Sequence, residues 1–184
     1  MITAAAPVRS RPFHAPAPSA TSEVPTSLDA LLALEAPALR ELYQGARVPR
    51  LSDVTGPLRG RMLAVPAVKG SLARAIRAFA SSDVFPWRGK SFTRKSEHRG
   101  DGINRVIRDR WTLYRFETFI GKSLAGDFDA VQLDYDLADN PFFIRPIRDE
   151  IREISPGLYL GQAYWQTARE AHLVLYFALA KTAP

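Results

Sequence analysis

Apolar and polar residues alternate through most of the chain after about residue 85, and one earlier run does the same. Aromatic and β-branched residues occupy the alternate positions, which is typical of antiparallel strands. The strands predicted from this pattern are 58–65, 89–94, 103–108, 111–119, 128–136, 147–154, 158–165 and 172–179. Since an open sheet of this size would expose two edges, we expect a closed barrel.

Turn-forming residues separate these runs and support hairpin connections between them. The expected separators are Gly100-Asp101-Gly102, residues 121–127, the Asn140-Pro141 region, Pro156-Gly157 and residues 166–171. A barrel of about eight such strands is either filled by side chains or holds one small ligand. We expect a hollow middle.

Two helical stretches are predicted outside the strands. The first begins at Ser27, whose hydroxyl can cap an early amide, and continues through a leucine stripe; Pro37 makes it either one kinked helix or two short ones. The second, 71–80, follows the first strand and places Leu72, Ala75, Ile76 and Phe79 on one face, as a lid or plug packed on the sheet would. The predicted fold is therefore mainly β, a lipocalin-like barrel with these helices added.

The segment IRDEIREI (147–154) fits either an amphipathic helix or a strand. A strand is favoured because Pro156-Gly157 is a turn signal and the next residues, LYLGQAYW, have a strand pattern. In a strand, Asp149 and Glu153 would face inward, where an unpaired carboxylate is too costly to persist. These two residues therefore require partners, a water or a ligand.

Length and composition are typical of one globular domain. The chain has 184 residues, and we expect a disordered leader, 1–26, rich in Ala, Pro, Ser and Thr, followed by a single domain, 27–184. The leader lacks the apolar stretch of a secretory signal and no apolar run is long enough to span a membrane, so a cytoplasmic location is expected. The net charge of +6 comes without a nucleic-acid-binding motif, so no nucleic-acid partner is expected.

Cysteine is absent and there are three histidines, His14, His98 and His172. Without cysteine, the chain can form neither a disulfide nor a thiolate metal site, and the presence of only three histidines argues against a histidine-rich metal cage. We expect no metal and no cofactor. A haem ligand at His172 is the alternative, and an exposed loop position beside Glu170 is the simpler interpretation.

Several short runs resemble a family of uncharacterised bacterial and fungal proteins. They are W-x-G-K-x-F at 87–92, Asn104-Arg105, LDYD at 133–136, IRDEIREISPGLYLG at 147–161 and YFAL at 176–179. The chain also resembles proteins with a GXWXG segment followed by a domain of unknown function, with Leu58 of GPLRG at the tryptophan position. The resemblance implies a lipocalin-like, or calycin-like, barrel that holds a small apolar molecule, and it implies no catalytic residue.

The candidate site is a group of charges on two adjacent strands, with aromatic residues as a lining. Asp149, Glu150 and Tyr135 are the catalytic candidates, because a carboxylate near a phenol can perform acid/base chemistry. The ligand-binding candidates are Arg148, Arg152, Asp134, Tyr114, Phe116, Tyr159, Tyr164 and Tyr176. A structural ion-pair network, and aromatic residues that simply form the core, are the alternatives.

Two further residues have simpler expected roles. Lys90 could meet an anionic ligand near a barrel mouth, but a solvated lysine is the simpler expectation. Asn104 is expected to cap a hairpin after Gly102. The predicted function is binding of a small hydrophobic molecule in the barrel. The alternatives are a cofactor-free enzyme, such as an isomerase, cyclase or hydrolase-like catalyst, and an interaction module that docks a partner.

Overall fold

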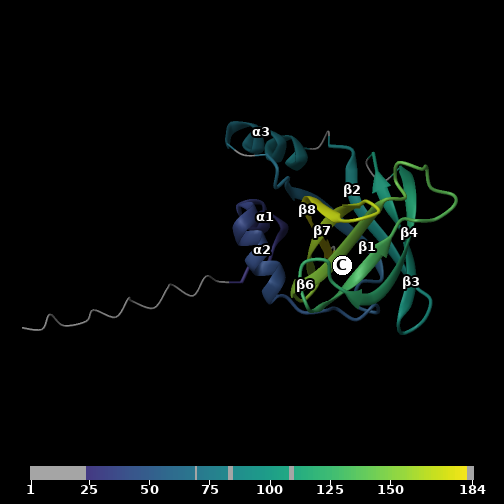
Figure 1. Ribbon diagram of the computed structural model, residues 1–184. Helices are drawn as coiled ribbons and strands as arrows, with labels where there is room; N and C mark the ends of the chain where they lie inside the picture. The colour runs from purple at the N-terminus through teal and green to yellow at the C-terminus, as the bar shows by residue number, and fades with distance from the viewer. Residues whose placement is uncertain (1–23, 69, 83–84, 108–109, 182–184) are drawn as a thin grey trace, which may run out of the picture.

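The chain forms a closed barrel of eight antiparallel strands, as expected from the sequence (Figure 1). This computed structural model describes residues 24–68, 70–82, 85–107 and 110–181, so most of the expected leader lies outside the described residues. Each strand pairs with the next and β8 pairs with β1. The strands are β1 (Gly56–Ala64), β2 (Trp87–Arg94), β3 (Arg99–Val106), β4 (Trp111–Lys122), β5 (Asp129–Asp134), β6 (Ile147–Ser155), β7 (Leu158–Gln166) and β8 (Ala171–Lys181).

All eight predicted strands are present, but one predicted turn was wrong. Gly100-Asp101-Gly102 lies inside β3, and the chain reverses instead at residues 95–98. There the hydroxyl of Ser96 accepts hydrogen bonds from the backbone N–H groups of His98 and Arg99, at 3.3 and 3.0 Å. The two glycines therefore have a packing role rather than a turn role.

Two short helices precede the barrel, which settles the alternative left open at Pro37. They are α1 (Leu28–Leu32) and α2 (Ala36–Gly45), and Pro37 occupies the first turn of α2, where its missing N–H is not needed. Ser27 caps α1 as predicted, accepting from Ala30 N at 3.1 Å. A third helix, α3 (Gly70–Ser81), connects β1 to β2. None of the helices in the described ranges is long and apolar enough to cross a membrane.

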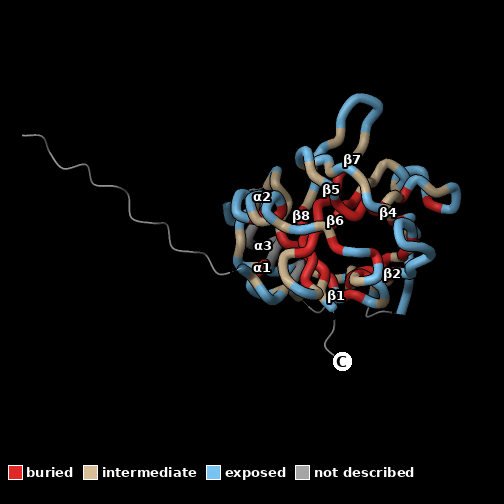
Figure 2. The backbone as a smooth tube through the Cα atoms, turned by 90° about the horizontal axis from the view of Figure 1, so that it is seen from below, coloured by how far each residue is buried: buried red, intermediate tan, exposed pale blue. Residues whose placement is uncertain are grey.

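The barrel has an inner core and an outer core. The outer core lies between α1–α2 and the outer face of the barrel, where Figure 2 shows the two helices beside β6 and β8. The guanidinium of Arg152 fastens α2 to this face by donating to Tyr43 O and Gln44 O, at 3.0 and 2.9 Å. These carbonyls are in the last turn of the helix, where Tyr43 O also accepts from Ala46 N at 3.3 Å.

Three inward-facing glycines make room for three large aromatic rings in the inner core. A Cβ at Gly60, Gly102 or Gly161 would lie 2.4, 2.2 and 2.2 Å from the nearest atom of Trp87, Phe116 and Phe177 respectively. The ring centroids of Trp87 and Phe177 are 5.8 Å apart, in an edge-to-face arrangement. The middle of the barrel is thus packed with rings, and the expectation of a hollow middle is corrected there.

One end of the barrel is closed by residues 46–55, which precede β1. Leu51 and Val54 join the inner core, and the hydroxyl of Tyr159 donates to Asp53 O at 2.6 Å. Glu153, predicted to face inward and to need a partner, receives the Arg47 guanidinium at 2.9 Å. The connections β1–β2, β3–β4, β5–β6 and β7–β8, including α3, are all at the opposite end, which we name the α3 end (Figure 1).

We predict that Gly102→Ala destabilises the protein because the new methyl group has no space beside the Phe116 ring and Ser91 O. Overpacking of this kind costs about 1–3 kcal/mol of the free energy of unfolding. Gly45→Ala is the matched control, because nothing lies within 4 Å of a Cβ there, at the end of α2. Urea unfolding of both variants checks this; equal stabilities would contradict the packing role.

Candidate functional site

Lys90 is the centre of a polar network inside the barrel. Its side chain is only 3% exposed, and its ammonium group contacts Asn104 Oδ1 at 2.8 Å, Asp149 Oδ2 at 2.9 Å and the hydroxyl of Tyr135. An ammonium group has three N–H donors, so these three contacts use all of them. The predicted solvated lysine is therefore wrong, because residue 90 faces the barrel interior.

Asn104 and Tyr135 complete the network from β3 and from the residue after β5. The Asn104 amide donates to Tyr135 OH and to Tyr114 O, both at 3.1 Å, and its Oδ1 also accepts from Trp87 Nε1 at 3.0 Å. The Tyr135 hydroxyl donates to Asp149 Oδ2 at 3.1 Å. The predicted hairpin cap at Asn104 is therefore corrected: its side chain satisfies groups inside the barrel.

Asp149, from β6, closes the network and leaves one acceptor unused. Its Oδ2 accepts from both Lys90 and Tyr135, whereas its Oδ1 is buried and has no hydrogen-bond partner in the described part of the chain. The inward orientation predicted for Asp149 is observed, and so is its need for a partner. An unpaired carboxylate oxygen in the interior is costly, so it marks a place where a donor group would be stabilised.

Aromatic rings surround the charged pair and separate it from water. The Lys90 ammonium lies 5.1–5.6 Å from the ring centroids of Trp87, Phe116, Tyr135 and Phe177. Burial lowers the pKa of Lys90, and Asp149 opposes that change; burial, with the Asp149 charge second, raises the pKa of Tyr135. Such a buried pair contributes little net stability compared with apolar residues of the same volume, which favours a functional role.

The predicted candidates do not form one cluster, because neighbouring strand residues face opposite sides of the barrel wall. Asp149 and Tyr135 are in the network, and Phe116 packs directly against it. Tyr114 is partly buried beside the inner core, and Tyr159 is inside but at the closed end. These five residues line the interior or its core, as a ligand-lining role requires.

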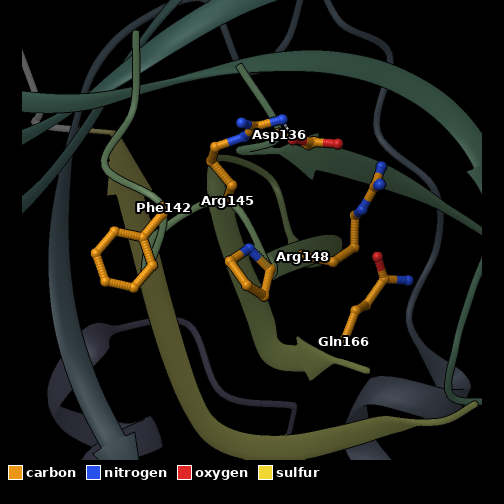
Figure 3. Close-up of a pocket in the computed structure, with 6 residues that line it drawn as sticks. Asp136, Phe142, Arg145, Arg148 and Gln166 are labelled. Carbon is orange, nitrogen blue, oxygen red and sulfur yellow. Dashed lines mark hydrogen bonds and ion pairs between the residues drawn. The ribbon is translucent and has the colours of Figure 1, made fainter. Parts of the chain in front are cut away.

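Arg148 and Asp134 lie on the outer face, where they form an ion pair of 2.7 Å (Nη1–Oδ2). Arg148 also borders an open surface pocket of about 360 Å³ at the α3 end, which Figure 3 shows. Asp136 and Arg145 pair across that pocket, with Arg145 Nε 2.7 Å from Asp136 Oδ1. Because both arginines already have carboxylate partners, this pocket has no free charge with which to select a ligand.

Four further candidates are on the outer face of the barrel but are buried there, namely Glu150, Arg152, Tyr164 and Tyr176. Glu150 accepts from Ser123 Oγ, Leu124 N and Gln132 Nε2 at 2.7, 2.9 and 3.1 Å. The Arg152 guanidinium stacks 4.2 Å from the Phe128 ring. Glu150 therefore cannot share a site with Asp149, because the two carboxylates lie on opposite faces of β6.

Lys90 and Asn104 are the site residues that sequence reasoning missed. The available signal was their parity, that is, which face of the strand each residue is on, because residues two apart share a face. Lys90 is two residues before the inward-facing Phe92, and Asn104 is two residues after the inward-facing Gly102. With Gly102 assigned to a turn, that parity could not be followed into β3. Both residues lie in runs that carry the resemblance, W-x-G-K-x-F and Asn104-Arg105.

The comparisons with known proteins support the fold and go no further. No family model and no curated protein matches this chain. A protein from Thermomonospora curvata, with a known crystal structure, has a similar fold, with a TM-score of 0.50 and 17% sequence identity. The match covers 82% of this chain and 89% of that one. Together with the closed eight-stranded barrel, this similarity fits the lipocalin-like architecture.

Removing one member of the Lys90–Asp149 pair should destabilise the protein far more than removing both. We predict that Lys90→Met lowers the free energy of unfolding by about 3–5 kcal/mol, because the Asp149 charge loses its counter-ion. The double variant Lys90→Met/Asp149→Leu should recover most of that loss. Urea unfolding of the two single variants and the double variant checks it; additive losses would show that the pair is not coupled.

Four of the six tyrosines should resist ionisation while the protein is folded. Burial raises the pKa of Tyr43, Tyr135, Tyr159 and Tyr164 above the usual value near 10. Since the folded-state pKa exceeds the unfolded one, their contribution to stability is present below about pH 10 and is lost as pH rises further. Phenolate absorbance at about pH 11 should report at most two ionised tyrosines in folded protein and all six in guanidinium. Four or more, with near-UV circular dichroism unchanged, would contradict this.

Proposed function

We propose that the barrel binds one small, largely apolar molecule from the α3 end, with a hydrogen-bond donor of that molecule on Asp149 Oδ1. The observation that carries the proposal is the buried network of Lys90, Asn104, Tyr135 and Asp149, in which this oxygen lacks a partner. The other polar groups of the network already have partners. A donor group is thus the one addition that the network can take.

The position of the network along the barrel supports entry from the α3 end. Lys90 is near the start of β2, Asn104 near the end of β3, and Asp149 near the start of β6, all of which lie toward that end. Partly buried apolar residues pack against the inner core there, namely Trp87, Tyr114, Ile144, Ile147 and Leu175. These side chains would contact the apolar part of the molecule, whereas Leu51 and Val54 join the inner core at the closed end.

Charge balance indicates a neutral donor. Lys90 and Asp149 already compensate each other, and so do Arg47 and Glu153 at the closed end. A ligand with an ammonium or carboxylate group would add a charge without a counter-ion in a medium of low polarity, at a cost of several kcal/mol. A hydroxyl or amide N–H supplies the donor without that cost. We therefore propose a neutral ligand class, apolar alcohols or amides.

Acid/base catalysis on the same bound molecule is the second candidate, and one contact favours it. The Asp149 carboxylate accepts a hydrogen bond from the Tyr135 phenol, and both groups are buried away from water. A carboxylate in such surroundings can exchange a proton with a substrate. Glu150 and Tyr159 do not contribute, because Glu150 is on the outer face and the Tyr159 hydroxyl is bonded to Asp53 O. A product of altered mass in the ligand screen below would identify this activity.

The experiment is native mass spectrometry with a matched set of straight-chain compounds that differ only in the head group: alcohol, primary amide, amine, carboxylate and plain alkane. We expect one alcohol or amide molecule per chain, with at least about tenfold weaker binding of the charged compounds. Lys90→Met/Asp149→Leu should bind alcohol and alkane equally. Arg148→Met is the control, since its neighbouring position on β6 faces outward.

Two outcomes would overturn the proposal. One is that no compound of the set is retained by the folded protein. The other is that Lys90→Met/Asp149→Leu keeps the preference for the alcohol, because the head group would then not contact Asp149. A selective loss in Arg148→Met would place the ligand in the outer pocket instead.

A further inference from the structure

Three of the four residues of the predicted apolar face of α3 lie in solvent rather than against the sheet, and the side chain of the fourth, Ile76, lies outside the described part of the structure. Leu72, Ala75 and Phe79 occupy one side of the helix, at i, i+3 and i+7, and all three are exposed, Leu72 by 60% and Phe79 by 52%. The helix was expected to pack as a lid or plug through this face. An amphipathic helix whose apolar side is turned to water lacks the surface that such a helix normally covers.

The neighbouring β3–β4 turn exposes large apolar side chains as well. Ile107 is 54% exposed, Trp111 62% and Leu113 41%. This turn is fixed to the segment that follows α3, because Ile107 N donates to Pro86 O at 2.6 Å and Trp87 pairs with Val106. The helix and the turn both lie at the α3 end (Figure 1), and we name their exposed side chains together the α3 surface.

Positive charge is concentrated in the same two segments. In the sequence, α3 and residues 107–113 together hold four basic residues and one acidic residue. The helix itself, GSLARAIRAFAS, has two arginines and no acidic residue. Exposed Leu, Ile, Phe and Trp among arginines is the composition of helices and loops that lie in the interface of an anionic bilayer.

We propose that the α3 surface docks on anionic lipid membranes. The exposed apolar side chains insert among the lipid head groups, and the exposed Arg110 contacts a lipid phosphate. Nucleic acid would also satisfy the charge, but it would leave the five exposed apolar side chains in water. Lipid accounts for both the charge and the apolar side chains, and it is therefore the occupant that we propose. This proposal does not depend on the ligand proposed for the barrel.

The test is co-sedimentation of the full chain with vesicles of phosphatidylcholine alone and of phosphatidylcholine mixed with phosphatidylglycerol. We expect binding to the mixed vesicles, and about tenfold weaker binding for each of Trp111→Ser, Leu72→Ser and Arg110→Glu. The matched controls are Leu124→Ser and Arg99→Glu, exposed residues of the same types at the opposite end of the barrel, which should bind within about twofold of the parent chain. Thermal unfolding verifies that each variant is folded.

Four outcomes would overturn the proposal. Failure of the parent chain to bind mixed vesicles is the first, and equal losses in the control variants are the second. The third is binding of a DNA duplex that is weakened by Arg110→Glu but not by Trp111→Ser, without vesicle binding, since the charge would then serve nucleic acid. A dimer in light scattering that Trp111→Ser dissociates, again without vesicle binding, would likewise assign the surface to a second copy.

Discussion

The ion pair between Lys90 and Asp149 is the constraint on which the interior of the barrel depends. A pair of charges in an apolar interior is stabilised when its donors and acceptors have partners, here all except Asp149 Oδ1, and when water is excluded. Tyr135 and Asn104 are the hydrogen-bond partners of the pair, and four aromatic rings keep water away from it. Those rings fit only because glycine stands opposite Trp87, Phe116 and Phe177. The glycines, the rings and the pair therefore form one cooperative unit.

This unit explains why the recognisable runs of the sequence are so far apart along the chain. W-x-G-K-x-F provides Trp87 and Lys90, LDYD provides Tyr135, the charged run of β6 provides Asp149, and YFAL provides Phe177. Each run is on a different strand, and closure of the barrel brings them to one place. The runs share a location rather than a local structure, and a buried polar network is the interaction that needs all of them at once.

The fold could be predicted from the sequence because alternation and turn residues report on each strand separately. The inward orientation of Asp149 and Glu153 followed from the same alternation within β6. The membership of the site could not be predicted, because it depends on which strands face one another across the interior. Gly100 and Gly102 were assigned to a turn by residue type, whereas the space that Gly102 leaves for Phe116 is known only once β4 is placed beside β3. Lys90 and Asn104 were missed for that reason.

The two ends of the barrel differ in a way that links the interior to the surface. At the closed end, residues 46–55 fill the opening and an ion pair joins Arg47 to Glu153. At the α3 end, the interior is bordered by partly buried apolar residues, and large apolar side chains are exposed on α3 and at the β3–β4 turn, namely Leu72, Phe79, Ile107, Trp111 and Leu113. A surface that exposes this much apolar area in water is stabilised when a lipid surface covers it. A molecule that is poorly soluble in water could then pass between the bilayer and the barrel without crossing the solvent, and the polar network would select it by its head group.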